Sequence, residues 1–263
     1  MQVSPKIYSK NYYETECGGW EDWQISRGRK IEPRLSYPLE LAKIKPGTTV
    51  LDFGCGRGEL TWQAAELGAN AIGMDYSAQA LKLAKKLPKI SKGKIKFVQN
   101  TSLKLPIQDN RVDCILFVDV LEHLYPAQLE KLLMEFRRVL KTGGRVILHT
   151  APNREFLEYG YPFFTRWISK LINPIYRILF GEWLITRADP RRPYDHLVHI
   201  NESSMAEVEA DFNRAGFGKV RLWYSSKFRD IRVRDHVRYN LLQPQWGPLK
   251  RWFCYDIWGI ITK

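Results

Sequence analysis

Apolar and polar positions alternate in blocks along most of the chain, and the lengths of these blocks predict strands and helices in turn. Short apolar runs typical of buried strands lie at 49–53, 70–75, 95–99, 112–118 and 144–150. Runs with helical spacing separate or follow them, at 58–67, 77–87 and 126–140. This alternation predicts successive βα units and a parallel, doubly wound α/β sheet with helices on both faces. We take residues 49–154 as this core.

The two ends of the chain are expected to complete the fold. Residues 1–48 hold aromatic and charged residues with weak helical periodicity, which predicts a helical cap ahead of the sheet. Residues 201–263 predict a helix at 202–215, capped by Asn201, followed by strands at 217–224 and 252–262.

Residues 155–200 interrupt the alternation of strands and helices. Apolar residues recur there at i, i+3 and i+4, with basic residues opposite and Pro174 expected to kink the run. The stripe comprises Phe164, Trp167, Ile168, Leu171, Ile172, Ile175, Ile178 and Leu179. The pattern predicts an amphipathic helical insertion. Its stripe packs onto the core, which is the commoner use, or faces an apolar substrate or a membrane surface.

Composition narrows the class of protein. A chain of 263 residues with 44% apolar residues can build a real core. The cysteines Cys17, Cys55, Cys114 and Cys254 form no C-x-x-C pair, so we expect reduced thiols in a cytosolic protein. No signal-peptide apolar region and no uncharged 18-residue apolar run is present, so we expect neither secretion nor a membrane span. The net charge of +13 indicates attraction to an anionic partner, and nucleic acid, phospholipid headgroups and phosphorylated substrates all qualify.

The most informative segment is Val50–Leu60, which reads VLDFGCGRGEL. A strand that ends at Gly54 needs a tight turn, which glycine allows, and the next helix then presents its N-terminus to a ligand. The dinucleotide fingerprint G-x-G-x-x-G would need glycine at 59, where the chain has Glu59. The acidic Asp52 ahead of the turn also suits a cationic ligand better than a pyrophosphate.

The turn does not stand alone. AIGMDYS at 71–77 is a short strand ending in Asp75, LPIQDN is a loop ahead of the apolar run VDCILFVDVLEHL, and LKTGGRVILHTAPN at 140–153 is a helix end, a turn and a strand. In order and spacing the chain resembles class I S-adenosylmethionine (SAM)-dependent methyltransferases of the type 11 group, strongly over about residues 48–153. The resemblance implies a Rossmann-like seven-stranded sheet, with a helical N-terminal cap and the insertion as a lid.

The resemblance implies SAM as cofactor and S-adenosylhomocysteine as product. The glycine turn would lie under the methionine part, and Asp75 would hold the ribose hydroxyls. Where the family commonly has an acidic residue that binds adenine, this chain has Thr101, so Thr101 and Ser102 are named for that contact. The predicted cofactor-binding residues are Asp52, Gly54, Cys55, Gly56, Gly58, Asp75, Tyr76, Thr101, Ser102 and Asp119.

The segment FVDVLEHL offers candidate catalytic groups. If a helical turn begins at Asp119, then Asp119, Glu122 and His123 share one face. Some quinone-ring O-methyltransferases resemble this chain in carrying acidic residues and a histidine that bind magnesium at this point. Three interpretations remain open: a catalytic base, a magnesium site, and a helix-capping acid beside a histidine that is hydrogen-bonded within the structure. We name His123 as catalytic and name no metal ligand.

A second candidate base lies in YDHLVHIN at 194–201. Neutral histidine can accept a proton near pH 7, and related methyltransferases often carry a histidine here, so His199 is the second predicted catalytic residue. A structural hydrogen bond is the alternative. His149 and His236 are expected to be structural. In the cap, Tyr12, Tyr13, Trp20 and Trp23 either close over the ligand or pack as aromatic core.

These observations predict a methyltransferase acting on a small-molecule or lipid- or glycan-linked acceptor, at oxygen. Contact with the inner surface of a membrane is left open, because the basic surface and the amphipathic insertion both agree with it. RNA methylation is the enzymatic rival, although DVLEH is not the Asn/Asp-Pro-Pro-Tyr motif of nucleic-acid amino methylases, and nucleic acid is not the expected partner. A SAM-binding protein without catalysis is the alternative from another class.

Overall fold

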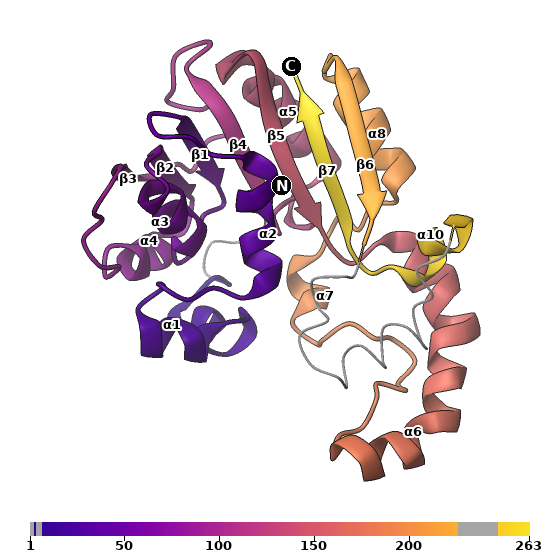
Figure 1. The fold of residues 1–263 in the computed structure, drawn as a ribbon. Coiled ribbons are helices and arrows are strands. Elements are labelled where there is room, and N and C mark those ends of the chain that lie inside the picture. The colour runs from indigo at the N-terminus through magenta and orange to yellow at the C-terminus, as the bar shows by residue number, and fades with distance from the viewer. Residues whose placement is uncertain (1–2, 4–6, 226–246) are drawn as a thin grey trace.

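A computed structural model of the chain describes residues 3, 7–225 and 247–263. Within them, seven strands form one mixed sheet in the order β3-β2-β1-β4-β5-β7-β6 (Figure 1). The strands are β1 (Thr49–Phe53), β2 (Asn70–Asp75), β3 (Lys94–Gln99), β4 (Val112–Val118), β5 (Leu140–Thr150), β6 (Lys219–Tyr224) and β7 (Ile257–Thr262). β1 to β5 are parallel, and β7 is antiparallel to both β5 and β6. The predicted doubly wound α/β sheet is confirmed.

Helices cover both faces of the sheet. On one side, α5 (Pro126–Val139) and α8 (Met205–Arg214) bury Phe136 and Phe212 among sheet residues such as Phe117. On the other side, α2 (Pro33–Ala42) and α3 (Glu59–Glu66) pack on Val50 and Leu116. Because successive residues of β4 point to opposite faces, its near-continuous apolar run supplies both layers.

The N-terminal cap is helical, as its pattern predicts. It consists of a wide helical turn, η1 (Tyr12–Glu16), then α1 (Trp20–Ser26) and α2. Tyr13 and Trp23 pack against α4 (Ala78–Ala84) in a separate apolar cluster. The cap therefore lies against the carboxyl ends of β1 and β2, where the glycine turn emerges.

The inserted segment is helical over much of its length. η3 (Phe156–Thr165) runs directly into α6 (Arg166–Phe180), which extends away from the sheet at the lower right of Figure 1. The helix continues through Pro174, so the segment 166–180 is one element. The expectation that the stripe packs onto the core is wrong for most of it, because Leu171 is 79% exposed and Ile178 is 82% exposed.

Two expectations for the C-terminal part also need correction. The strand expected at 252–262 begins only at Ile257, and residues 250–253 form the short helix α10 (Lys250–Phe253). In this region the side-chain amide of Asn153 donates to the carbonyls of Arg251 and Cys254, whose bonding partner is therefore a side chain and not a neighbouring strand. The last helix is capped by Ser204 and not by Asn201, since Ser204 and Glu207 form a reciprocal capping box.

The basic run at 227–238, with His236, lies outside the described residues. In the described part of the chain, no helix combines the length and the apolar character that a membrane span needs.

Candidate functional site

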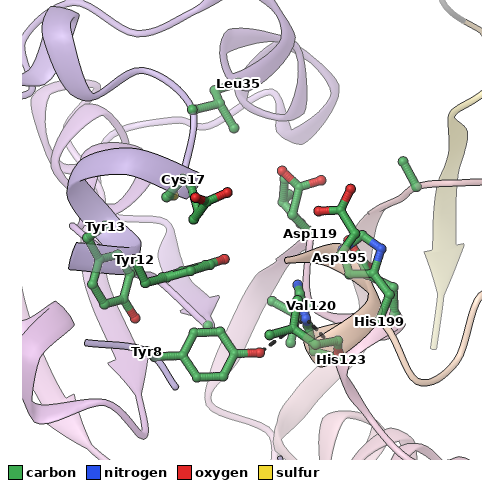
Figure 2. A pocket seen from close by; sticks show the side chains of 18 of the residues that line it. Tyr8, Tyr12, Tyr13, Cys17, Leu35, Asp119, Val120, His123, Asp195 and His199 are labelled. Carbon is green, nitrogen blue, oxygen red and sulfur yellow. Dashed lines mark hydrogen bonds between the residues drawn. The ribbon is translucent and has the colours of Figure 1, made fainter. Parts of the chain in front are cut away.

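A cavity of about 610 Å³ opens at the carboxyl ends of β1, β2 and β4, between the sheet, the N-terminal cap and the segment that leads into α8. Figure 2 shows side chains from these three parts converging on it. The strands end here, so the loops that carry polar residues meet at this edge of the sheet. Its volume lies within the range typical of small-molecule sites.

The glycine turn is shaped by steric limits at both ends. Gly54 has φ of 75°, and a Cβ there would lie 2.3 Å from a methyl of Val120. Gly58 has φ of 82°, and a Cβ there would lie 2.9 Å from the ring of Phe97. Of the predicted cofactor-binding residues, Gly58 alone does not line the cavity, so it acts by letting α3 approach the sheet.

Gly56 differs from the other two glycines because it faces open space. A Cβ at Gly56 would find no atom closer than 3.9 Å, on the ring of Tyr13. The Gly56 N–H donates to Asp75 Oδ2 at 2.9 Å, which fixes the turn against the end of β2. The backbone at Gly56 is thus free for close approach by a ligand.

Asp75 lies where its motif predicts, at the end of β2 in the wall of the cavity. Its Oδ2 accepts from Gly56, and its Oδ1 accepts from the backbone N–H of Ser77 at 2.8 Å. Burial raises the pKa of this carboxyl to about 6. Asp75 therefore both shapes the loop and presents a desolvated carboxyl to the cavity. The ring of Tyr76, which follows, lines the cavity and packs edge-on against Tyr8.

Asp52 and Cys55 also line the cavity, and both are buried. Asp52 accepts a hydrogen bond from Thr61 Oγ1 at 2.6 Å, and burial raises its pKa to about 7. Burial likewise raises the pKa of the Cys55 thiol. Thr101 and Ser102 lie on an exposed loop at the cavity rim, where the side chain of Asn100 donates to the Ser102 carbonyl.

Asp119 does not share a helical face with Glu122 and His123, and this expectation is corrected. Its φ of 55° lies outside the helical region, and its carboxylate accepts from Arg34 at 2.6 Å and from His149 Nδ1 at 2.5 Å. Burial acts to raise the pKa of Asp119, but Arg34 and His149 hold it well below its usual range. These contacts place Asp119 in the cavity wall beside two cationic partners.

His149 links Asp119 to a second carboxylate, on Asp256, in the core. Its Nε2 lies 3.0 Å from Asp256 Oδ1, and its ring lies 4.1 Å from that of Trp258. Burial alone would lower the pKa of His149, but the carboxylates of Asp119 and Asp256 raise it above the usual value. With both ring nitrogens bonded, His149 serves the structure, and its proton fixes the orientation of Asp119.

Glu122 and His123 lie on a short turn, η2 (Leu121–His123), and reach different partners. Glu122 Oε2 accepts from Thr150 Oγ1 at 2.8 Å, and burial together with the charge of Asp119 raises its pKa to about 8. His123 Nδ1 lies 3.1 Å from the Tyr8 hydroxyl (Figure 2) and 3.1 Å from the Val198 carbonyl. Burial lowers the pKa of His123, so its ring is neutral at neutral pH.

His199 comes to the same place from a distant segment, at the end of α7 (Asp195–Val198). Its ring centroid lies 4.9 Å from that of His123. In the part of the chain that the structure describes, its buried Nδ1 has no hydrogen-bond partner, and the nearest carboxylate oxygen, on Glu202, is 3.8 Å away. Burial and the neighbouring His123 lower the pKa of His199 to about 4. The structure thus brings the two predicted catalytic histidines together.

One atom from each of Glu122, His123 and His199 falls within 4.8 Å of the others, a set that could hold a metal ion. Two imidazoles and one carboxylate suit a transition metal, whereas magnesium prefers oxygen ligands. Asp119 lies outside this set and is engaged by Arg34 and His149. The structure therefore groups His199, and not Asp119, with Glu122 and His123.

Sequence reasoning missed Arg57, which lies inside the glycine turn and is 3% exposed. Its guanidinium donates to the carbonyls of Tyr13, Cys17 and Gly18, and its Nε donates to Glu59 at 2.8 Å. Arg57 therefore ties the cap to the glycine turn. The sequence feature that could have identified it is a charged residue placed between two glycines of a turn expected to be buried.

The cap aromatics divide into two groups. Tyr12 and Tyr13 line the cavity (Figure 2), whereas Trp20 and Trp23 stack on each other at 5.0 Å and do not line it. The Tyr194 hydroxyl also donates to the Ile7 carbonyl at 2.5 Å, which joins the segment before α7 to the N-terminal cap. The arrangement is a partly open pocket with buried carboxyls in its wall, which suits a cationic ligand.

Comparison with known proteins agrees with this geometry. Residues 51–148 match a family model described as a methyltransferase domain. An uncharacterized methyltransferase of Synechocystis is 37% identical over 107 residues, which are 41% of this chain and 49% of that protein. A ubiquinone biosynthesis O-methyltransferase of Aliivibrio fischeri is 28% identical over 79% of this chain and 82% of its own length.

The fold has solved counterparts. A phosphoethanolamine N-methyltransferase of Haemonchus contortus, in complex with S-adenosylhomocysteine, superposes with a TM-score of 0.62 at 15% identity. That match covers 99% of this chain and 61% of the other, and it supports the fold alone. This chain spans about half the length of the Synechocystis relative that it matches.

Proposed function

The core of this chain is the methyltransferase domain of the class I SAM-dependent methyltransferases, whose cofactor is SAM, and from this premise we propose that the protein methylates a small-molecule or lipid- or glycan-linked acceptor at oxygen. The single observation that carries the proposal is the pairing of His123 and His199 in the cavity that the glycine turn and Asp75 also line. A binding loop and a pair of neutral bases share one cavity.

The residues present fit the cofactor. Gly56 leaves open space in front of its backbone, and Asp52 and Asp75 place buried carboxyls in the same wall. SAM, when bound, supplies an electrophilic methyl carbon on a positively charged sulfur. We propose that Asp75 holds the ribose hydroxyls, that Asp52 and Asp119 balance the positive charge, and that Thr101 and Ser102 contact the adenine.

The protein contributes to the chemistry in two ways: it positions the acceptor against the methyl group, and it supplies one proton acceptor. We assign the base to His199, because it lines the cavity and because burial and the neighbouring His123 lower its pKa and keep it neutral. His123 Nδ1 already lies between the Tyr8 hydroxyl and the Val198 carbonyl. His123 then orients His199 through the contact between their rings. A hydroxyl on the acceptor loses its proton to His199 as the oxygen attacks.

A proton acceptor suits an acceptor atom that loses a proton as it is methylated, and a hydroxyl oxygen is such an atom. The family relatives include an O-methyltransferase of ubiquinone biosynthesis, whose name describes that protein alone. We propose that this chain's acceptor carries a hydroxyl, and that a lipid or glycan carrier presents it at the inner surface of the membrane. The high basic charge supports such a location.

The experiment is methyl transfer from methyl-labelled SAM to separated lipid, RNA and small-molecule fractions of the source cell. We expect label in the lipid or small-molecule fraction, released on treatment that cleaves methyl ethers or esters. Label confined to RNA would establish RNA methylation instead. Tight SAM binding without label in any fraction would indicate a binding protein and remove the proposal.

A further inference from the structure

α6 differs from an ordinary surface helix in its exposed side. Its inner face buries Ser169, Asn173 and Tyr176, of which Tyr176 packs in a small apolar cluster with Leu184, whereas its outer face is apolar and open to solvent. We call the outer surface the α6 outer face, formed by Trp167, Leu171, Ile175, Ile178, Leu179 and Trp183, which are 58–82% exposed. A contiguous exposed apolar surface of this kind marks a contact site.

Specific contacts hold the helix in this orientation. Asn173 Oδ1 accepts from the backbone N–H of Leu184 at 2.8 Å, and its amide donates to the Leu184 carbonyl at 3.3 Å. Thr165 and Ser169, on the same inner side, line the cavity. Rotating the helix to bury its apolar face would break these contacts and place apolar residues on the cavity side. The outward apolar face is therefore built into the structure.

The charges around this face identify its partner. α6 carries Arg166, Lys170 and Arg177 and no acidic residue. Lys170 Nζ lies 4.4 Å from the centre of the Trp167 ring, and Arg177 lies 5.9 Å from that of Trp183. Tryptophan paired with basic residues at the border of an apolar stripe is the composition of a helix lying in a headgroup layer. A second copy of the chain would bring the same cations together, which opposes self-association.

We propose that the α6 outer face lies on an anionic lipid bilayer, with the helix parallel to the membrane plane. The apolar side chains enter the acyl boundary, and the lysine and arginines meet lipid phosphates. Because the inner side of the same helix lines the cavity, the bilayer sits directly across α6 from the site. The inference concerns a surface outside the proposed reaction and holds whichever atom is methylated.

Flotation with vesicles tests it on the full chain. Vesicles of phosphatidylcholine mixed with phosphatidylserine should recover more protein than vesicles of phosphatidylcholine alone, and the difference should shrink as salt rises. The variant Leu171→Ser/Ile175→Ser/Ile178→Ser should bind the mixed vesicles at least about tenfold more weakly. Its matched control is Ile25→Ser/Leu67→Ser/Met134→Ser, in which the replaced side chains are also exposed, and which should bind as the wild type does.

A second pair of variants separates charge from apolar contact. Lys170→Gln/Arg177→Gln should abolish most of the preference for phosphatidylserine, at about fivefold per charge. Lys82→Gln/Lys131→Gln removes two exposed lysines elsewhere and should leave the preference intact.

Three results would overturn the proposal. The first is equal recovery of the wild type and of Leu171→Ser/Ile175→Ser/Ile178→Ser on the mixed vesicles. The second is a lower solution mass of that variant, which would show that the face is a contact between copies of the chain. The third is a large loss of thermal stability in that variant, which would show that the face belongs to the core. SAM affinity, measured by calorimetry, should be the same in all variants. If the wild type does not bind SAM, the proposed function is contradicted, but the conclusion about membrane binding is unaffected.

Discussion

Three carboxyl groups lie in the cavity wall with almost no contact to water: those of Asp52, Asp75 and Glu122. Burial raises their pKa values to about 7, 6 and 8 respectively. Such groups gain from a nearby positive charge, because it stabilises their ionised forms. The residues around the cavity therefore favour a cationic ligand before any specific contact is considered.

Asp75→Asn should weaken SAM binding by about 1.5–3 kcal/mol, roughly 10- to 150-fold, because one acceptor oxygen is replaced by an NH2 group. The melting temperature should also fall slightly, since Asp75 accepts from both Gly56 and Ser77. Calorimetry gives the affinity, with Asp22→Asn, a partly exposed carboxylate outside the cavity, as the control. Unchanged affinity in Asp75→Asn would remove Asp75 from the cofactor site.

His199→Gln should lower the rate of methyl transfer about 10²- to 10⁴-fold, as expected on loss of a general base, while SAM affinity stays the same. The wild-type rate should fall as the pH drops towards about 4, where His199 becomes protonated, and the residual rate of the variant should lack this dependence. The exposed His196→Gln is the matched control. Equal rates in wild type and His199→Gln would return His199 to a structural role.

At the scale of elements, periodicity predicted the sheet and most helices because those runs depend on local spacing and burial. It failed where side chains bond to the backbone. The Asn153 amide donates to carbonyls of the segment 251–254 from about a hundred residues away, and Ser204 outcompetes Asn201 as a cap because Glu207 completes the box. The exposed stripe of α6 was visible as a pattern, but periodicity cannot say which face meets the protein.

The residues of the site also fall into those that local sequence predicted and those that depend on distant contacts. The glycine turn and Asp75 are contiguous motifs, so the sequence located them. The turn at Asp119 was expected to be helical, yet Arg34 and His149 draw its carboxylate elsewhere. His199 and His123 were chosen separately, and their contact depends on the packing of α7 beside η2. Pairings between distant segments of this kind cannot be read from spacing.

Arg57→Met should destabilise the protein by about 3–5 kcal/mol, because it leaves Glu59 as an unpaired buried carboxylate and three cap carbonyls without their donor. The loss should concentrate in the cap, so limited proteolysis should cut within residues 7–26 earlier than elsewhere. Thermal unfolding measures the stability, with the exposed Arg29→Met as the control. Identical melting of Arg57→Met and wild type would show that the cap is held by its aromatic packing instead.

At the scale of the whole molecule, the buried carboxyls should make stability depend on pH. Asp52 and Glu122 have folded-state pKa values of about 7 and 8, above their ordinary values of 3.8 and 4.5. Their contribution is therefore complete below the ordinary values and is lost as the pH rises through 7 and 8. His199 has the opposite sign, since its lowered pKa costs stability as the pH falls from 6.5 towards 4.

We expect the melting temperature of the ligand-free protein to fall between about pH 6.5 and pH 8.5, because the buried carboxyls ionise there and His149, whose pKa is raised, loses its proton. SAM should reduce this fall, because its positive charge stabilises the ionised carboxyls. Glu122→Gln should flatten the profile, and the exposed Glu130→Gln should not. A melting temperature that rises over this interval in the wild type would contradict the assignment of raised carboxyl pKa values.

The position of β7 has a consequence for how the protein is made. β7 follows β6 in the sequence but lies between β5 and β6 in the sheet. As the nascent chain leaves the ribosome, β5 can pair with β4, but its other edge and β6 have no strand partner until residues 257–262 are outside the exit tunnel. Until then, one edge of β5 exposes unpaired backbone groups, a surface on which other chains can add strands. Synthesis therefore passes through a stage in which β5 is an edge strand of the growing sheet.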